Sequence, residues 1–204
     1  MNQQLLPLIA LLLCMSKAVA AMFKVARKID GDSLAGGRGV SMVPTSGKYS
    51  KVVLWFHGLG DEADGWSELM PNLGLEDTKF VLPTAQTLPI TLNGGFKMTG
   101  WSDIIGLDLN SPEDKAGFDD SAQRIDSIIK HEIANGISTN NIAIGGFSQG
   151  GALALHYSLR SAHSLNSCVA LSTWLPLRDE YPLAMSSAAK SLPILQCHGE
   201  ADQV

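Results

Sequence analysis

This sequence has few cysteines and no cluster of positive charge. Its three cysteines, Cys14, Cys168 and Cys197, have neither the spacing of a metal site nor the number that a disulfide framework requires. Cys168 and Cys197 lie in apolar runs, where a free cysteine usually acts as a small core hydrophobe. The formal net charge is −5, and the absence of a basic stripe argues against binding to nucleic acid.

Internal repeats and low-complexity segments are also absent, and the composition is that of a folded globular protein. Hydrophobic residues make up 45% of the 204 residues and charged residues 17%, a balance that excludes a disordered chain. This length suits one domain with a sizeable core, and we expect that domain to span residues 21–204.

The N-terminus has the pattern of a targeting segment. Residues 5–15 are almost all apolar, but this run is too short for a membrane span. Small residues at 18–20 match a signal-peptidase site, although no lysine or arginine precedes the apolar run. We predict a cleaved signal over residues 1–20 and a secretory location. The alternatives are an uncleaved anchor or an extension upstream of a start at Met22.

Apolar runs alternate with helical segments along the rest of the chain. This order predicts an α/β fold with a mostly parallel sheet covered by helices on both faces, and with ligands at the carboxyl ends of the strands. Residues 118–135 have an apolar stripe at helical spacing, with Asp119 and Asp120 at the start and Gly136 as the stop. Residues 84–114 form a long connection of the kind that is usually functional. Strands are expected at 51–56, 79–83, 142–144, 167–171 and 192–197, short edge strands or a lead-in at 23–50, and a short helix near 67–73.

Residues 141–159, NIAIGGFSQGGALALHYSL, contain a serine between glycines at a strand-to-helix turn. This is the context of a nucleophile elbow, in which Gly146 and Gly150 permit the tight turn around Ser148. The hydroxyl of Ser148 would then be exposed, and the backbone N–H of Gln149 would face an oxyanion beside it. The alternative is a glycine-rich turn whose serine only caps the helix.

Seven motifs in order resemble one family, the acyl-protein thioesterase and lysophospholipase branch of the α/β-hydrolases. Together they span about residues 52–204, nearly all of the chain after the N-terminal segment, and their order and spacing make the resemblance far more specific than G-x-S-x-G alone. The motifs are HGLGD at 57–61, PTA at 83–85, PITLN at 89–93, WSDIIGLD at 101–108, GGFSQGGALAL at 145–155, ALSTWLPL at 170–177 and ILQCHGEAD at 194–202.

The resemblance implies a role for individual residues. Ser148 is expected to be the nucleophile, the N–H groups of Leu59 and Gln149 the oxyanion hole, and Asp202 the acid that orients a histidine base. No metal or organic cofactor is implied. Ser102 departs from the larger aromatic residue expected there, which affects the shape of the acyl groove. Apolar residues expected to line that groove, or otherwise to pack beneath loops, are Ile90, Leu92, Phe96, Met98, Trp101, Trp174 and Leu175.

In the family pattern the base is a histidine on a loop after the next strand, which these residues do not include. The last strand and the C-terminal helix are also missing from this sequence, so we expect a domain that is incomplete at its C-terminus. His57 is expected to hold the oxyanion loop and His198 to be structural. Three explanations stay open: a fragment of an active enzyme, a short isoform that binds acyl groups without catalysis, or a domain that folds poorly because a sheet edge is bare.

The expected function is hydrolysis of long-chain acyl thioesters or esters through an acyl-enzyme on Ser148. Acylated proteins and lysophospholipids are the expected substrates, with transient contact to a membrane surface and no nucleic-acid partner. A general carboxylesterase is a further alternative. The family resemblance implies a cytoplasmic location as the alternative to secretion.

Overall fold

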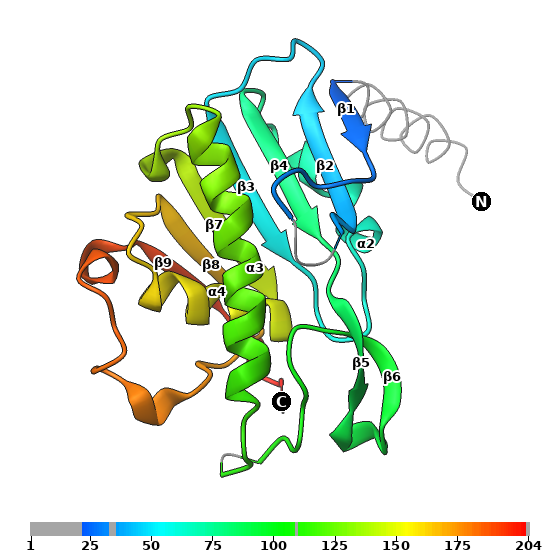
Figure 1. The fold of residues 1–204 in the computed structure, drawn as a ribbon, viewed down its shortest axis with the longest axis vertical. Helices are drawn as coiled ribbons and strands as arrows, with labels where there is room; N and C mark the ends of the chain where they lie inside the picture. Colours follow the sequence, from blue (N-terminus) through cyan, green and yellow to red (C-terminus); the bar gives the residue numbers. More distant parts are fainter. Residues whose placement is uncertain (1–21, 33–35, 109, 203–204) are drawn as a thin grey trace, which may run out of the picture.

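The computed structural model describes residues 22–32, 36–108 and 110–202, so the expected signal segment, residues 1–20, lies outside the described residues. A seven-stranded sheet has the order β1-β2-β4-β3-β7-β8-β9 (Figure 1). Neighbouring strands from β4 to β9 are parallel, and β1 and β2 are antiparallel to their neighbours. The expected mostly parallel sheet is confirmed. Its strands are β1 Phe23–Ala26, β2 Gly39–Pro44, β3 Lys51–Phe56, β4 Thr78–Pro83, β7 Ile142–Phe147, β8 Ser167–Leu171 and β9 Ile194–Cys197.

The centre of the sheet pairs an aromatic strand with a glycine-containing one. In the register of β3 and β7, Trp55 lies opposite Gly145 and Phe56 opposite Gly146. A Cβ atom at Gly145 would lie 2.8 Å from the Trp55 ring. Small residues on β7 therefore let the large side chains of β3 pack against it, and this places the end of β7 in the middle of the fold.

Helices cover both faces of the sheet, as expected. One face packs against α3 (Lys115–Ala134) and α4 (Gln149–Arg160), in the larger of the two hydrophobic clusters (Figure 1). The other face carries a second cluster, in which Met70 and Trp66 join the aromatic residues of β3 and β4. Those two residues come from α2 (Asp64–Ser67) and the short 3-10 helix Met70–Leu73. In the described part of the chain, none of the helices is both long and apolar enough to cross a membrane.

Helix α3 begins three residues earlier than the sequence pattern predicted. Its N-cap is Asp114, whose side chain accepts a hydrogen bond from the backbone N–H of Gly117 at 3.0 Å. The prediction that Asp119 and Asp120 mark its start was therefore wrong, because a capping carboxylate outside the apolar stripe begins the helix. The stripe also carries buried charge, since Arg124 is 3% and Glu132 1% exposed.

The long connection between β4 and α3 contains a hairpin that the sequence pattern did not reveal. Strands β5 (Gln86–Ile90) and β6 (Phe96–Gly100) pair antiparallel in a separate two-stranded sheet, joined through the 3-10 turn Thr91–Asn93. Pro89 within β5 breaks the usual strand pattern, which is why these residues resemble a loop in sequence. The hairpin extends beyond the carboxyl ends of the strands (Figure 1).

Strand β9 forms the edge of the sheet beside β8. All four of its residues are exposed, Cys197 among them. The expectation that Cys197 is a core residue was wrong, because the described elements leave the side chains of β9 open to solvent. The same expectation for Cys168 on β8 is confirmed, since it is fully buried and burial raises its thiol pKa to about 11.

Candidate active site

Ser148 occupies a strained corner between β7 and α4. Its backbone has φ 53° and ψ −123°, a conformation that residues with a side chain rarely adopt. Its side chain makes no capping hydrogen bond to α4, so the alternative of a serine that only caps the helix does not hold. Strain of this kind costs about 1–3 kcal/mol and is concentrated at functional sites.

Two glycines allow this corner to form. A Cβ atom at Gly146 would lie 2.4 Å from the carbonyl carbon of Gly150, and one at Gly150 would lie 2.1 Å from the carbonyl oxygen of Phe56. The corner is also tied to its neighbours, because the N–H of Ser148 donates to the Leu171 carbonyl at 2.9 Å. These contacts set the position of Ser148 against the end of β3.

The loop after β3 passes directly beside Ser148. A Cβ atom at Gly58 would lie 3.5 Å from the Ser148 Cβ, which places the next residue, Leu59, at the corner. Gly60 donates its N–H to the Thr99 carbonyl at 2.8 Å, and the Thr99 hydroxyl donates to the carbonyl of Asp61 at 2.6 Å. Strand β6 therefore holds the loop that is expected to supply one oxyanion-hole N–H group.

His57 is a buried support of this loop. It is 1% exposed, and its Nε2 accepts a hydrogen bond from the Ala85 N–H at 3.0 Å. Its Nδ1 therefore carries the proton and donates to the Gly58 carbonyl at 2.7 Å. Burial lowers the pKa of His57, and the nearby Arg124 charge lowers it further. With both nitrogens engaged, His57 is not placed to accept a proton from Ser148.

The side chain of Gln149 has a structural function that sequence reasoning missed, because only its backbone N–H was considered. It is fully buried, and its Oε1 accepts from the Trp101 N–H at 3.0 Å. Its Nε2 donates to the Ser102 carbonyl at 2.7 Å. Since Trp101 Nε1 donates to the His57 carbonyl at 2.9 Å, Gln149 links the first turn of α4 to the support of the oxyanion loop.

Asp202 follows β9 at the carboxyl ends of the parallel strands, where Ser148 follows β7. His198 Nε2 lies 3.4 Å from Asp202 Oδ2, and both side chains are partly exposed. The His198 ring thus contacts the expected acid. The role of Asp202 toward a histidine base stays a prediction.

The apolar residues expected to line an acyl groove fall into four groups. Ile90 and Trp101 are almost fully buried, at 0% and 2% exposed. Met98 lies near the oxyanion loop, with its Sδ 3.7 Å from a Cβ placed at Gly60. Their role in binding substrate stays a prediction. Of the others, Leu92 and Phe96 are exposed on the hairpin, and Trp174 and Leu175 are partly buried in the loop after β8.

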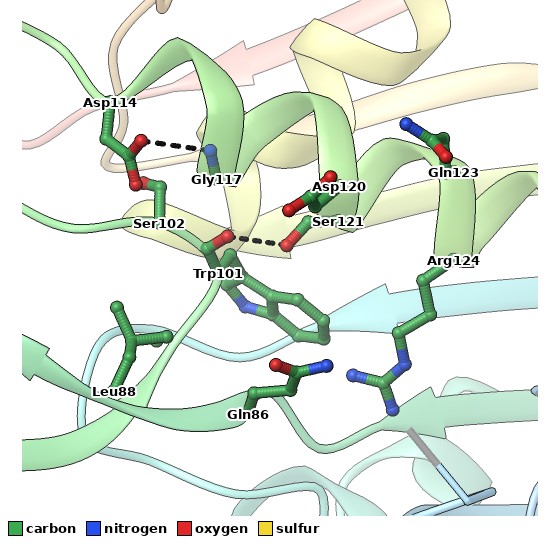
Figure 2. Close-up of a pocket in the computed structure, with 11 residues that line it drawn as sticks. Gln86, Leu88, Trp101, Ser102, Asp114, Gly117, Asp120, Ser121, Gln123 and Arg124 are labelled. Atoms are coloured by element: carbon green, nitrogen blue, oxygen red, sulfur yellow. Dashed lines mark hydrogen bonds between the residues drawn. The ribbon is translucent and has the colours of Figure 1, made fainter. Parts of the chain in front are cut away.

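A cavity of about 390 Å³ lies between the β5–β6 hairpin and the first turns of α3 (Figure 2). Trp101 forms one wall, with Gln86 and Leu88 on one side and Asp120 and Arg124 on the other. Neither Ser148 nor Leu59 lines it. Because polar groups form much of its wall, this cavity does not suit an acyl chain, and it is separate from the elbow.

Comparison with known proteins agrees with this geometry. Residues 39–204 match the phospholipase/carboxylesterase family. The chain is 41% identical over 161 residues to "Acyl-protein thioesterase 1 homolog 1" of Dictyostelium discoideum, which covers 76% of this chain and 70% of that protein. The crystal structure of Zea mays acyl-protein thioesterase 2 superposes with a TM-score of 0.71 at 32% identity, covering 89% of this chain and 77% of that one. Arabidopsis thaliana SOBER1 gives a TM-score of 0.70 at 32% identity, covering 73% of each chain. This protein belongs to the phospholipase/carboxylesterase family of α/β-hydrolases.

Proposed function

We propose that this protein is a serine hydrolase that cleaves long-chain acyl thioesters, through an acyl-enzyme on Ser148. The observation that carries the proposal is the strained corner at Ser148, with a partly exposed side chain that does not cap its helix. A conformation this unfavourable, held by glycines that admit no side chain, is what the nucleophile of a hydrolase requires.

The proposed chemistry uses two N–H groups at that corner. As the Ser148 oxygen bonds to the acyl carbon, its proton passes to a histidine, which the family supplies from a loop after the next strand, and Asp202 orients that histidine. The N–H groups of Leu59 and Gln149 stabilise the oxyanion, and Gln149 is the first residue of a twelve-residue helix whose N-terminal dipole favours negative charge. The C–S bond breaks and the sulfur leaves as a thiol with the proton from the histidine, and water then hydrolyses the acyl-enzyme to release the fatty acid and regenerate the Ser148 hydroxyl.

Thioesters are proposed above lysophospholipids and simple carboxylesters because similar proteins from several organisms are named acyl-protein thioesterases. The same names weigh against a non-catalytic acyl-binding module. An apolar groove between the hairpin and the loop after β8 would favour long chains, since each buried methylene contributes about 0.8 kcal/mol.

Transient contact with a membrane surface is part of this proposal. Phe96 is 68% and Leu92 43% exposed on the hairpin that projects beyond the strand ends (Figure 1). We infer that these two exposed apolar side chains contact the boundary of a lipid surface. Cosedimentation with vesicles should weaken in the Phe96→Ser, Leu92→Ser double variant, and equal binding would remove this part of the proposal.

The resemblance to acyl-protein thioesterases supports the cytoplasmic alternative for its location. We propose that location above the secretory one. Recovery of intact chain in a cytosolic fraction would support it, whereas secreted material beginning at Ala21 would establish the signal peptide instead.

An active-site-directed fluorophosphonate tests the catalytic proposal. The full-length protein should be labelled at Ser148, and the Ser148→Ala variant should lose both the label and the hydrolysis of a palmitoyl thioester. Equal labelling of both proteins would contradict the proposal. A series of acyl thioesters and matched oxygen esters would then rank the substrates by kcat/KM.

A further inference from the structure

A buried ion pair joins α3 to the segment that precedes β2. Arg124 Nη2 lies 2.7 Å from Asp32 Oδ2, and its Nε lies 3.0 Å from each carboxylate oxygen. The two side chains are 4% and 0% exposed. Removing such charges from water costs several kcal/mol per ion, so a buried pair by itself is weak evidence for stability. The burial of this pair therefore needs a reason other than stability, and the other contacts of Arg124 supply one.

Two further contacts of Arg124 lead toward the oxyanion loop. Its Nη1 donates to the Thr84 carbonyl at 2.8 Å, and its guanidinium lies 5.5 Å from the centre of the Trp101 ring (Figure 2). Thr84 precedes Ala85, whose N–H donates to His57 Nε2, and Trp101 donates to the carbonyl of His57. Each of the two contacts of Arg124 is therefore followed by a hydrogen bond to His57.

His57 in turn holds the loop of Leu59, because its Nδ1 donates to the carbonyl of the intervening residue at 2.7 Å. We propose that Arg124, paired with Asp32, is a positioning residue that holds the N–H of Leu59 in place for the oxyanion. This inference rests on the function proposed above. It assigns Arg124 no contact with substrate and no direct part in the chemistry.

The charge of Arg124 has a second consequence for His57. His57 must be neutral to accept a hydrogen bond from Ala85, since a protonated ring would point N–H at N–H. Burial and the Arg124 charge lower the pKa of His57, whereas Asp61 and Glu62 raise it, as does the hydrogen bond to the Gly58 carbonyl. Loss of the Arg124 charge should therefore raise this pKa.

A matched pair of double variants tests the proposal. The Arg124→Met, Asp32→Asn variant removes both charges without leaving either one buried alone. The control is Lys79→Met, Glu132→Gln, which removes another buried pair, formed between β4 and the same helix α3, 2.6 Å apart with side chains 8% and 1% exposed. Arg124→Lys keeps the charge but loses the planar guanidinium.

Activity per site labelled by the fluorophosphonate should distinguish the Arg124–Asp32 pair from the control pair. In the Arg124→Met, Asp32→Asn variant we expect kcat to fall at least about 10-fold with KM changed less than about twofold, because misplaced oxyanion donors affect the transition state alone. The control should keep kcat within about twofold. Arg124→Lys should lower kcat and leave the His57 pKa near the wild-type value. An equal loss of kcat in the test and control variants would overturn the proposal.

NMR supplies a readout that needs no hydrolysis. In the Arg124→Met, Asp32→Asn variant the Leu59 amide resonance should move, whereas the control variant should leave it in place. The comparison can be made in a Ser148→Ala background. If Ser148 proves not to be the nucleophile, the proposed function fails while this shift still reports the linkage. An unmoved Leu59 amide would overturn the inference, whatever the enzyme does.

Discussion

Glu113 and Trp174 connect the loop before α3 to the loop after β8. Trp174 Nε1 lies 3.2 Å from Glu113 Oε1, and the N–H of Leu177 donates to Glu113 Oε2 at 2.8 Å. Leu177 has a left-handed backbone with φ 52°. One carboxylate therefore sets the distance between two segments in which residues were expected to line an acyl groove.

Substitution of Glu113 should affect substrate selection more than stability. In Glu113→Gln we expect the free energy of unfolding to change by less than about 1 kcal/mol, because the bonds are solvent-exposed. KM for a long-chain thioester should rise by about fivefold, the equivalent of about one hydrogen bond, with little change for a short-chain one. Steady-state kinetics on both substrates measure this. Asp77→Asn, at the opposite end of the sheet, is the control, and a uniform effect on both chain lengths would contradict the prediction.

His57 should behave as a structural residue. His57→Phe retains a ring but leaves the Ala85 N–H and the Gly58 carbonyl without their buried partner. We expect the free energy of unfolding to fall by about 1–3 kcal/mol, since the buried Ala85 N–H is left unsatisfied, whereas the Gly58 carbonyl still accepts from the Asp61 N–H at 3.2 Å. Urea denaturation measures it. His163→Phe, at a partly exposed site, should cost under about 1 kcal/mol, and similar values for the two variants would count against the role of His57.

Gly150 should tolerate no side chain, for reasons of space and not of backbone conformation. In Gly150→Ala the added Cβ would meet the Phe56 carbonyl oxygen at 2.1 Å, so strands and helix must separate. We expect a loss of about 3 kcal/mol or more. Gly47→Ala is the comparison, because Gly47 has φ 71° but no atom within 4 Å, and it should cost only about 1–2 kcal/mol. Chemical denaturation of both variants measures the two losses of stability, and a larger loss in Gly47→Ala than in Gly150→Ala would contradict the prediction.

His156 should make stability depend on pH. Burial lowers its pKa from 6.5 to about 4, helped by Arg160 and Lys115 and opposed by Asp119. Because the pKa of His156 is lower in the folded protein than in the unfolded chain, the unfolded chain binds the proton at a higher pH. The free energy of unfolding should therefore decline as the pH falls from 6.5 to 4. The contribution is about 3 kcal/mol at most. Unfolding free energies measured at several pH values should fall less steeply in His156→Gln, and parallel curves would show that His156 is not responsible.

Local patterns predicted the strands, the elbow and the helices on both faces. Apolar runs and glycine spacing act over a few residues, so a residue such as Ser148 could be placed at a turn from its neighbours alone. The hairpin β5–β6 escaped prediction because Pro89 disrupts the strand pattern. The start of α3 was misplaced because its cap, Asp114, lies outside the apolar stripe.

Polar contacts between distant segments could not be predicted. Asp32 and Arg124 are 92 positions apart, and Glu113 and Trp174 are 61 apart. No periodicity in the sequence marks a charged side chain such as Arg124 as buried, or pairs Glu113 with Trp174. Their partners are decided only when the strand order brings the segments together.

The sequence by itself determined the family, the parallel sheet and the position of Ser148 at a tight corner, because all three follow from motifs and spacing within short stretches. Only the tertiary structure decided how that corner is supported: His57 bonds to Ala85 and Gly58, and Arg124 of α3 contacts Thr84 and Trp101 beside it. The reason is that a hydrogen bond depends on distances of about 3 Å between atoms, which are set by the packing of whole elements and not by the order of residues along the chain.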